Sequence, residues 1–330
     1  MKKKLFSGIQ PSGEIHVGNY VGAIKNWVSL LDTYDCIFCI VDYHAITVEY
    51  EPSEMQTRIL NASAVNIACG LDPARCTIFV QSHVPEHTEL AWIFNTVTPM
   101  GELQRMTQFK EKSQQHAANI NVGLFDYPVL QAADILLYKA VAVPVGEDQV
   151  QHIELSREIA RKFNVRFPRP SAGGVFPDPQ HLLSPTPRIM GLDGKTKMSK
   201  SLNNYIGMLD EPDTIRLKLR TAFTVESRLR RSDPGNPDIC NIFTLHKSFT
   251  PPDVVARIYE DSKSAKLGCV DCKKMLAENM IRELTPIREK ARDLMANPDR
   301  VRAILAAGAA RCKSLAAETM REAKQVMGLA

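Results

Sequence analysis

Hydrophobic and polar positions alternate in two ways along the chain, and the change comes at about Asp210. Before it, short apolar runs are separated by segments with apolar residues every three or four positions. This is the pattern of a parallel sheet covered by helices. The predicted strands are Lys4–Ser7, Cys36–Val41, Thr77–Gln81 and Val141–Pro144. The predicted helices are Val17–Leu31, Ser53–Cys69, Glu86–Phe94 and Gln149–Phe163.

Local signals refine this picture. Ser53 followed by Gln56 predicts a capping box, and Pro85 predicts a helix opening at Glu86. Residues 164–187 contain six prolines and a Gly-Gly pair, which predicts an irregular connection. Beyond Asp210 the strand signals fade and helical spacing dominates. The helices predicted there are Asp213–Ala222, Asp253–Ser262, Cys272–Ala296 and Asp299–Met327.

Composition sets the broad class. The chain has 330 residues, of which 44% are hydrophobic and 24% charged, enough for two domains with a large core. It has no apolar run of the roughly 18 residues that a membrane span needs and no secretory pattern after Met1, so we expect a cytoplasmic protein. The net charge is +4, and residues 206–330 hold 22 basic and 17 acidic groups. That excess could attract RNA, although an ordinary solvated helical surface explains it equally well.

A glycine-rich segment, Phe6–Tyr20, follows the first predicted strand and opens the first helix. A helix start there would offer free N–H groups and a positive dipole end to a phosphate. Gly13 and Gly18 would let a nucleotide approach the backbone. The spacing fits neither a dinucleotide fingerprint nor a P-loop, and a tight turn alone explains such glycines more often.

A lysine loop, Lys197–Ser201, supplies a second element. Two lysines and two hydroxyls on a loop preceded by glycine can surround a polyphosphate and stabilise charge on a departing pyrophosphate. Its letters, Lys-Met-Ser-Lys-Ser, are those of the signature loop of class I aminoacyl-tRNA synthetases. His16–Asn19 resembles the His-Ile-Gly-His element of the same class, with Asn19 in the last position as in the tryptophanyl branch.

Three further stretches resemble the tryptophanyl-tRNA synthetase family: Cys39–Thr47, Arg105–Ser113 and Asp126–Asp148. The resemblance implies a Rossmann-like catalytic domain over residues 1–205 and a helical anticodon-binding domain over residues 206–330, whose last helix could pack back on the first. It also implies tRNA(Trp), L-tryptophan and ATP as partners, a homodimer, and no membrane association. Alternatives are tyrosyl-tRNA synthetase, a small adenylyltransferase and a non-catalytic regulator.

By the family's pattern, Asp134 accepts a hydrogen bond from the indole N–H of tryptophan. Indole is only a donor, so a buried acceptor rejects amino acids that lack the donor. Gln131 departs from the methionine common in the family. The implied tryptophan-binding residues are Phe6, His44, Tyr127, Gln131, Asp134, Val143, Val145 and Gln149. Tyr127 and Gln149 would hold the ammonium group, and His44 would help to place the carboxylate and phosphate.

The resemblance implies that ATP and Mg²⁺ bind beside the tryptophan. The implied catalytic residues are His16, Asn19, Lys112, Lys197 and Lys200. The implied ATP-binding residues are Gln10, Pro11, Ser12, Gly18, Asn19, Gly146, Glu147, Asp148, Ile189, Lys197, Met198, Ser199, Lys200 and Ser201.

Three of the eight cysteines form a separate candidate site. Cys269 and Cys272 have the two-residue gap that lets two thiolates face one metal ion. Some family members hold a [4Fe–4S] cluster with four cysteines, which here would be Cys240, Cys269, Cys272 and, at the remaining position, Ser262. A labile cluster and a vestigial site both stay open. Cys36 and Cys39 share the gap, but their positions in a predicted strand face opposite sides and indicate core packing.

Overall fold

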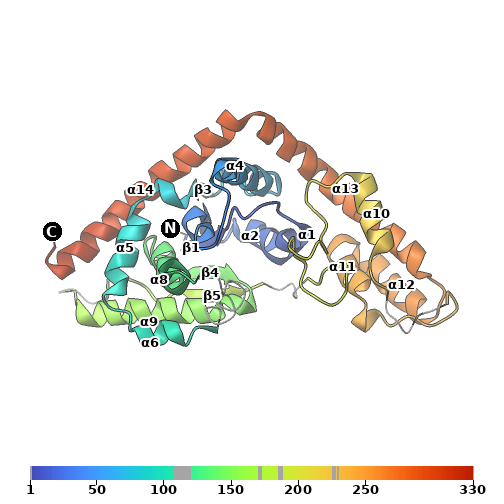
Figure 1. Ribbon diagram of the computed structural model, residues 1–330, viewed down its shortest axis with the longest axis horizontal. Coiled ribbons are helices and arrows are strands. Elements are labelled where there is room, and N and C mark those ends of the chain that lie inside the picture. Colours follow the sequence, from blue (N-terminus) through green and yellow to red (C-terminus); the bar gives the residue numbers. More distant parts are fainter. Residues whose placement is uncertain are drawn as a thin grey trace.

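The computed structural model describes residues 2–107, 120–169, 173–184, 189–224, 228 and 230–329. Their strands form a five-stranded parallel sheet with helices on both faces, and the C-terminal part is helical (Figure 1), which confirms the predicted fold class. The strand order is β3-β2-β1-β4-β5. The strands are β1 (Lys4–Ile9), β2 (Asp35–Ile40), β3 (Thr77–Val80), β4 (Ala142–Val145) and β5 (Gln180–Leu183).

Successive strand residues point into two different cores, one on each face of the sheet. Leu5 and Cys36 belong to the first core, whereas Phe6 and Cys39 belong to the second, as the alternation of a strand requires. Cys36 and Cys39 are therefore core residues, as predicted. The first core is covered by α1 (Val17–Asn19), η1 (Tyr20–Ile24), α2 (Lys25–Leu30), α4 (Pro52–Ala68) and α13 (Cys269–Ala296). The second is covered by α5 (Glu86–Asn95), α8 (Val122–Leu136), α9 (Val150–Arg166) and most of α14 (Pro298–Met327).

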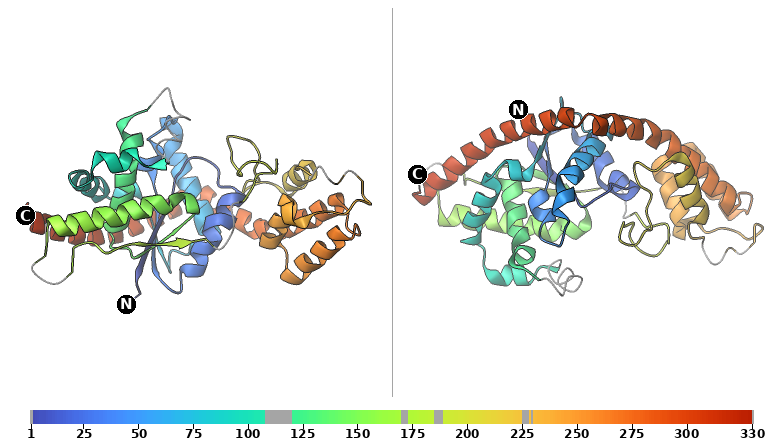
Figure 2. Two further views of the ribbon diagram at one scale, coloured as in Figure 1. Left: turned by 90° about the horizontal axis from the view of Figure 1, so that it is seen from below. Right: turned by 45° about the horizontal axis from the view of Figure 1, so that its top comes forward.

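The last helix, α14, runs along the sheet at its edge strand β3 and continues to the far end of the molecule (Figures 1 and 2). A Cβ on Gly308 would lie 2.0 Å from the carbonyl oxygen of Ile78, so helix and strand backbones nearly touch. Arg311 pairs with Asp35 at 2.7 Å, which ties the helix to β2 as well. Covering an edge strand in this way removes a surface that would otherwise pair with another chain.

The smaller helices complete the two ends of the molecule. In the part of the molecule that contains the sheet, α3 (Asp42–Ala45) and the 3-10 turn η2 (Gln81–His83) follow β2 and β3 directly. The remaining elements are α6 (Met100–Gln104), η3 (Glu147–Gln149), α10 (Pro212–Thr221), η4 (Pro237–Ile239), α11 (Asn241–Phe249) and α12 (Pro252–Lys263). Among the helices that the structure describes, none has both the length and the apolar character needed to cross a membrane.

Three local predictions were wrong. Helix α4 is capped by Glu51, whose side chain accepts from the Ser53 N–H at 3.2 Å, because Pro52 occupies the first helical position instead of Ser53. The helix predicted over residues 17–31 is interrupted by the π-helical turn η1. The proline-rich stretch predicted to be irregular contains β5, which pairs with β4.

Candidate functional site

A cavity of about 320 Å³ lies at the carboxyl ends of β1 and β4. The strand order reverses between these two strands, since β2 lies beyond β1 and β5 lies beyond β4. Such a switch point leaves a crevice because the connections leave the two strands in opposite directions. Gly8 and Gln10 come from the end of β1, and Pro144 and Gly146 come from the end of β4. The topology therefore places a ligand-sized cavity next to the glycine-rich segment.

All the residues predicted to bind tryptophan line this one cavity. They come from β1, α3, α8, β4 and η3, so the fold gathers them from sequence positions 6 to 149. Two residues predicted to bind ATP, Gln10 and Gly146, line it too. The lining residues shared with the tryptophan prediction are Phe6, His44, Tyr127, Gln131, Asp134, Val143, Val145 and Gln149.

Asp134 is the hydrogen-bonding centre of the cavity. It lies on α8 with 1% of its surface exposed. Its Oδ2 is 2.7 Å from Nε2 of His44, and its Oδ1 is 2.7 Å from Nε2 of Gln81 and 2.6 Å from Nδ1 of His87. Burial by itself would raise the pKa of Asp134, but His44 and His87 lower it below its usual range. The cavity therefore presents an ionised carboxylate, and His44, predicted to act on the substrate carboxylate, is bonded to Asp134.

The other walls of the cavity are a mixture of rings and amides. Phe6 stacks on Tyr138, with ring centroids 5.7 Å apart, so its ring is supported from behind. The Tyr127 hydroxyl lies 3.1 Å from Nε2 of His152. Gln131 donates from Nε2 to Oε1 of Gln149 at 3.5 Å. Polar groups are thus placed at a few points of a largely apolar cavity, as is common in small-molecule sites.

The first helix opens with a reciprocal cap. The Asn19 N–H donates to Nδ1 of His16 at 3.4 Å, and the His16 N–H donates to Oδ1 of Asn19 at 3.1 Å. Burial, followed by the nearby charges of Lys200 and Lys197, lowers the pKa of His16 to about 4. The imidazole is therefore neutral near pH 7, and because its Nδ1 accepts a hydrogen bond, its proton is on Nε2.

The lysine loop lies against the glycine-rich turn. Lys200 donates from Nζ to the carbonyl oxygen of Ser12 at 3.0 Å, which joins two motifs that are 188 residues apart. Gly13 has a φ of +120°, and a Cβ there would lie 2.9 Å from Nζ of Lys200. A glycine at this position is favoured by the backbone conformation, and its lack of a side chain leaves room for the lysine.

Asn204 holds the lysine loop in shape. Its Nδ2 donates to Oδ2 of Asp193 at 2.9 Å and to Oγ1 of Thr196 at 2.8 Å, and its Oδ1 accepts from the Ser199 N–H at 2.7 Å. Asn204 is 5% exposed. These bonds fix the loop on both sides of Lys197 before any ligand binds.

The other residues predicted to bind ATP are distributed around the loop and η3. Ile189 and Met198 are buried in the first core, and the Met198 N–H donates to the Ile189 carbonyl at 3.2 Å. Asp148 is exposed, and a Cβ on Gly146 would lie 2.7 Å from its Oδ1, so the glycine permits this approach. Glu147 lies between Gly146 and Asp148, and Pro11 lies between Gln10 and Ser12. A Cβ on Gly18 would lie 3.4 Å from Cβ of Met198, and the Ser199 and Ser201 hydroxyls are 2.8 Å apart. Lys112 lies outside the described residues.

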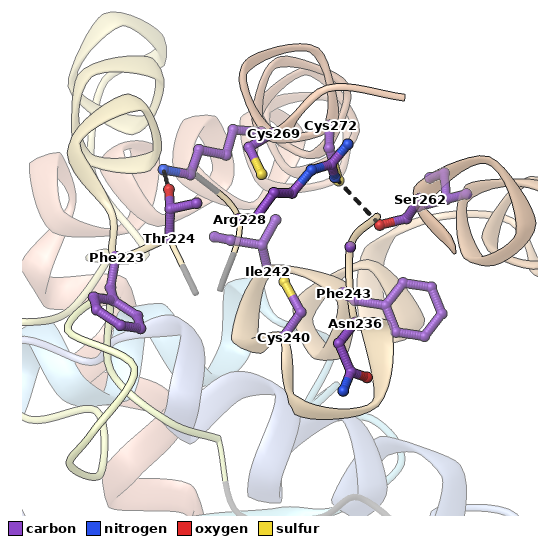
Figure 3. A pocket seen from close by; sticks show the side chains of 13 residues that line it. Phe223, Thr224, Arg228, Asn236, Cys240, Ile242, Phe243, Ser262, Cys269 and Cys272 are labelled. Carbon is purple, nitrogen blue, oxygen red and sulfur yellow. Dashed lines mark hydrogen bonds between the residues drawn. The ribbon is translucent and has the colours of Figure 1, made fainter. Parts of the chain in front are cut away.

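Cys240, Cys269 and Cys272 line a second cavity of about 40 Å³, together with Ser262. Figure 3 shows the cysteines on α13 and at the start of α11, with Arg228 reaching between them toward Ser262. Arg228 donates to Oγ of Ser262 at 3.5 Å and to the carbonyl of Leu267 at 2.7 Å.

This second cavity does not fit an iron–sulfur cluster. Its volume holds only a few water molecules, and a guanidinium group crosses the space where a cluster would lie. Burial, with Cys240 and Cys269 nearby, raises the pKa of the Cys272 thiol to about 12, so the thiol is protonated. No three His, Cys, Asp or Glu side chains of the described residues could hold a metal ion together. The sequence-based expectation of a cluster is therefore not supported.

Sequence reasoning missed three residues of the network around Asp134: Gln81, His87 and Tyr138. Gln81 follows β3, and polar side chains at the carboxyl ends of neighbouring parallel strands converge, so its position alone was a signal. His87 and Tyr138 carried no such signal, because only the packing of α5 on α8 brings them together.

Comparisons with known proteins agree with this geometry. Residues 2–285 match the family model "tRNA synthetases class I (W and Y)". The "Tryptophan--tRNA ligase" of Deinococcus radiodurans is 49% identical, with 98% of each chain covered, and that of Caldanaerobacter subterraneus is 46% identical, with 99% of this chain and 98% of the relative covered. A crystal structure of tryptophanyl-tRNA synthetase from Campylobacter jejuni, complexed with ADP and tryptophan, superposes with a TM-score of 0.87 at 33% identity over 99% of this chain and all of the other.

Proposed function

The chain belongs to the class I tRNA synthetases for tryptophan and tyrosine, and on this premise we propose that it is a tryptophan–tRNA ligase. It activates L-tryptophan with ATP and transfers the amino acid to tRNA(Trp). The observation that carries the choice of amino acid is the buried, ionised carboxylate of Asp134 in the cavity at the switch point. An indole N–H can only donate, so this carboxylate is its natural partner.

The first step is attack by the tryptophan carboxylate on the α-phosphorus of ATP. A new O–P bond forms, the bond to the β-phosphate oxygen breaks, and pyrophosphate leaves with the negative charge. The attacking carboxylate is already ionised near pH 7, so no general base is needed and catalysis depends on position and positive charge. Lys197 and Lys200 supply that charge from the loop held by Asn204, and Lys112 would add a third cation.

Mg²⁺ adds further positive charge at the phosphates when it is bound with ATP. The neutral His16 can donate a hydrogen bond from Nε2 to a phosphate oxygen without adding a third positive charge beside Lys197 and Lys200. In the second step, a terminal ribose hydroxyl of tRNA, the 2′-hydroxyl in class I practice, attacks the tryptophanyl carbonyl and AMP leaves.

Residues 206–330 are proposed to bind the anticodon of tRNA, and their charge of +5 supports contact with RNA. The proposal includes a homodimer in the cytoplasm. Trp92 on α5, Met100 on α6 and Val165 on α9 are 73%, 66% and 82% exposed, and all three helices pack on α8. Large apolar side chains exposed on three helices that pack on α8 support a subunit interface. An iron–sulfur cluster is not part of the proposal.

ATP–pyrophosphate exchange with tryptophan, with tyrosine and without an amino acid tests this function. We expect exchange with tryptophan only, followed by charging of tRNA(Trp) when tRNA is added. Exchange with tyrosine alone would reassign the cavity to the sister enzyme. Exchange without any amino acid would indicate an adenylyltransferase, and no exchange at all would indicate a non-catalytic relative.

A further inference from the structure

The hydrogen bonds of Asp134 divide unequally between its two oxygens. Oδ1 is approached by two groups, the Gln81 amide at 2.7 Å and His87 Nδ1 at 2.6 Å. Oδ2 is approached by one described group, His44 Nε2 at 2.7 Å. Each carboxylate oxygen accepts about two hydrogen bonds. Oδ1 is therefore saturated, and the remaining acceptor position is on Oδ2.

Tyr138 determines which way His87 donates. Its hydroxyl lies 2.7 Å from Nε2 of His87, on the opposite side of the ring from Asp134. Burial raises the pKa of Tyr138 far above its usual value, so the hydroxyl keeps its proton. If Tyr138 donates to Nε2, Nδ1 carries a proton and donates to Asp134. The other tautomer would place an unprotonated nitrogen 2.6 Å from a carboxylate oxygen, which is repulsive.

The two residues that contact Oδ1, and Tyr138 behind them, are buried. Gln81 and His87 have no exposed surface, and Tyr138 is 1% exposed. The His87 ring is also stacked on Phe79, with centroids 5.7 Å apart, so it cannot turn without disturbing the second core. The Tyr138 hydroxyl interacts further with the Cys312 thiol on α14. These side chains are thus held in place by packing and closed off from solvent.

We propose that Gln81, His87 and Tyr138 are positioning residues for amino-acid selection: they saturate Oδ1 of Asp134, so that the carboxylate offers a single acceptor position, on Oδ2, to a ring N–H in the cavity. This inference rests on the proposed function. A carboxylate with a free position on each oxygen could rotate toward His44 or bind water, and its preference for an N–H donor would fall. The three residues touch Asp134 or each other and have no role in the chemical step.

The test compares tryptophan with its benzothiophene analogue, in which sulfur replaces the indole N–H, in pyrophosphate exchange. The quantity measured is the ratio of kcat/KM for the two amino acids. His87→Leu removes the donor, and we expect the ratio to fall about tenfold. His87→Asn keeps a donor close to the Nδ1 position and should retain most of the ratio. Tyr138→Phe removes the hydroxyl that favours the His87 tautomer with its proton on Nδ1, and it should lower the ratio by less than His87→Leu does.

His246→Leu is the matched control, because His246 is as completely buried as His87. The substitution removes imidazole hydrogen bonds to the Thr250 hydroxyl and the Cys272 carbonyl, which lie away from the cavity. A purely structural role for His87 would lower kcat/KM for both amino acids and leave their ratio unchanged. An unchanged ratio in His87→Leu and Tyr138→Phe would overturn the inference, and Tyr138→Phe decides the matter alone if His87→Leu does not fold. Wild-type enzyme without tryptophan-dependent exchange would instead refute the proposed function.

Discussion

Gly308→Ala tests how closely the last helix packs on the sheet. Gly308 lies in the middle of α14, where helix propensity alone predicts that alanine stabilises the protein by about 1 kcal/mol. The structure predicts the opposite. The added Cβ would lie 2.0 Å from the Ile78 carbonyl oxygen and 2.8 Å from its carbonyl carbon, both of which are backbone atoms of β3.

The loss of stability depends on how far α14 and β3 must separate to accept the new Cβ. Ordinary contact begins at 3.4 Å, so helix and strand must separate locally by about 1.4 Å, the difference between 3.4 and 2.0 Å. The helix cannot move alone, because Cys312 and Ala316 on the same side have no exposed surface and are packed in the second core. Overpacking of this kind typically costs 1–3 kcal/mol. After the propensity gain is subtracted, we expect a net loss of up to about 2 kcal/mol.

Urea unfolding followed by far-ultraviolet circular dichroism measures this loss as a shift of the midpoint at unchanged slope. The matched control is Ala307→Gly, one position earlier and exposed, which should lose about 1 kcal/mol through propensity alone. A Gly308→Ala protein more stable than wild type by the full propensity gain of about 1 kcal/mol would refute the packing of α14 on β3.

Four further predictions concern the charges, the subunit interface and the cysteines. Lys200→Ala should slow tryptophan-dependent pyrophosphate exchange by about 10²–10³-fold with little change in tryptophan affinity. Lys195→Ala, just before the lysine loop, should leave the rate unchanged, and equal rates for both variants would remove Lys200 from the mechanism. Between pH 6.5 and about 4 the unfolded His16 binds a proton that the native one does not, so stability falls as the pH is lowered. His16→Gln should flatten that part of the urea midpoint curve, and an unchanged slope would contradict the assignment. Trp92→Glu should convert a dimer into monomers in sedimentation velocity, and persistence of the dimer would place the interface elsewhere. Iron analysis of anaerobically purified protein should find no stoichiometric iron, and an absorbance band at about 400 nm would contradict the packing around Arg228.

The sequence predicted the elements whose patterns are strong and local. Strands β1 to β4 were found because each is a run of buried residues next to turn signals. Strand β5 was missed because it is an edge strand of four residues, half-exposed and surrounded by prolines, so it shows no apolar run. Helix α8 was not predicted as a helix, and Pro128 within it explains why: a proline usually marks a helix end.

The site divides in the same way. Residues next to a motif, such as His16 and Lys200, could be selected from local sequence, and the structure brings them together. The cysteine spacing was equally clear, yet it misled, because Arg228 fills the space between the thiols from a loop that no local pattern connects to them. The spacing of cysteines in the sequence indicates which thiols can lie close together, but not whether another side chain occupies the space between them.

The positive charges of the lysine loop are held close to the glycine-rich turn before any ligand binds. Among the described residues, no carboxylate lies within 4.0 Å of Lys197 or Lys200, although both lysines act on His16 and the charge of Glu14 acts on Lys200. Burial lowers the pKa of Lys200, which means that holding this ammonium group beside the glycine-rich turn is unfavourable in the free protein. The bonds of Asn204 keep the loop formed despite that cost. In the proposed reaction, a bound polyphosphate would reduce this cost by adding negative charge beside Lys200, and the reduction would be greatest as charge builds on the departing pyrophosphate. Preformed, unpaired positive charge of this kind favours the transition state over the bound substrate, which is the condition for catalysis rather than for binding alone.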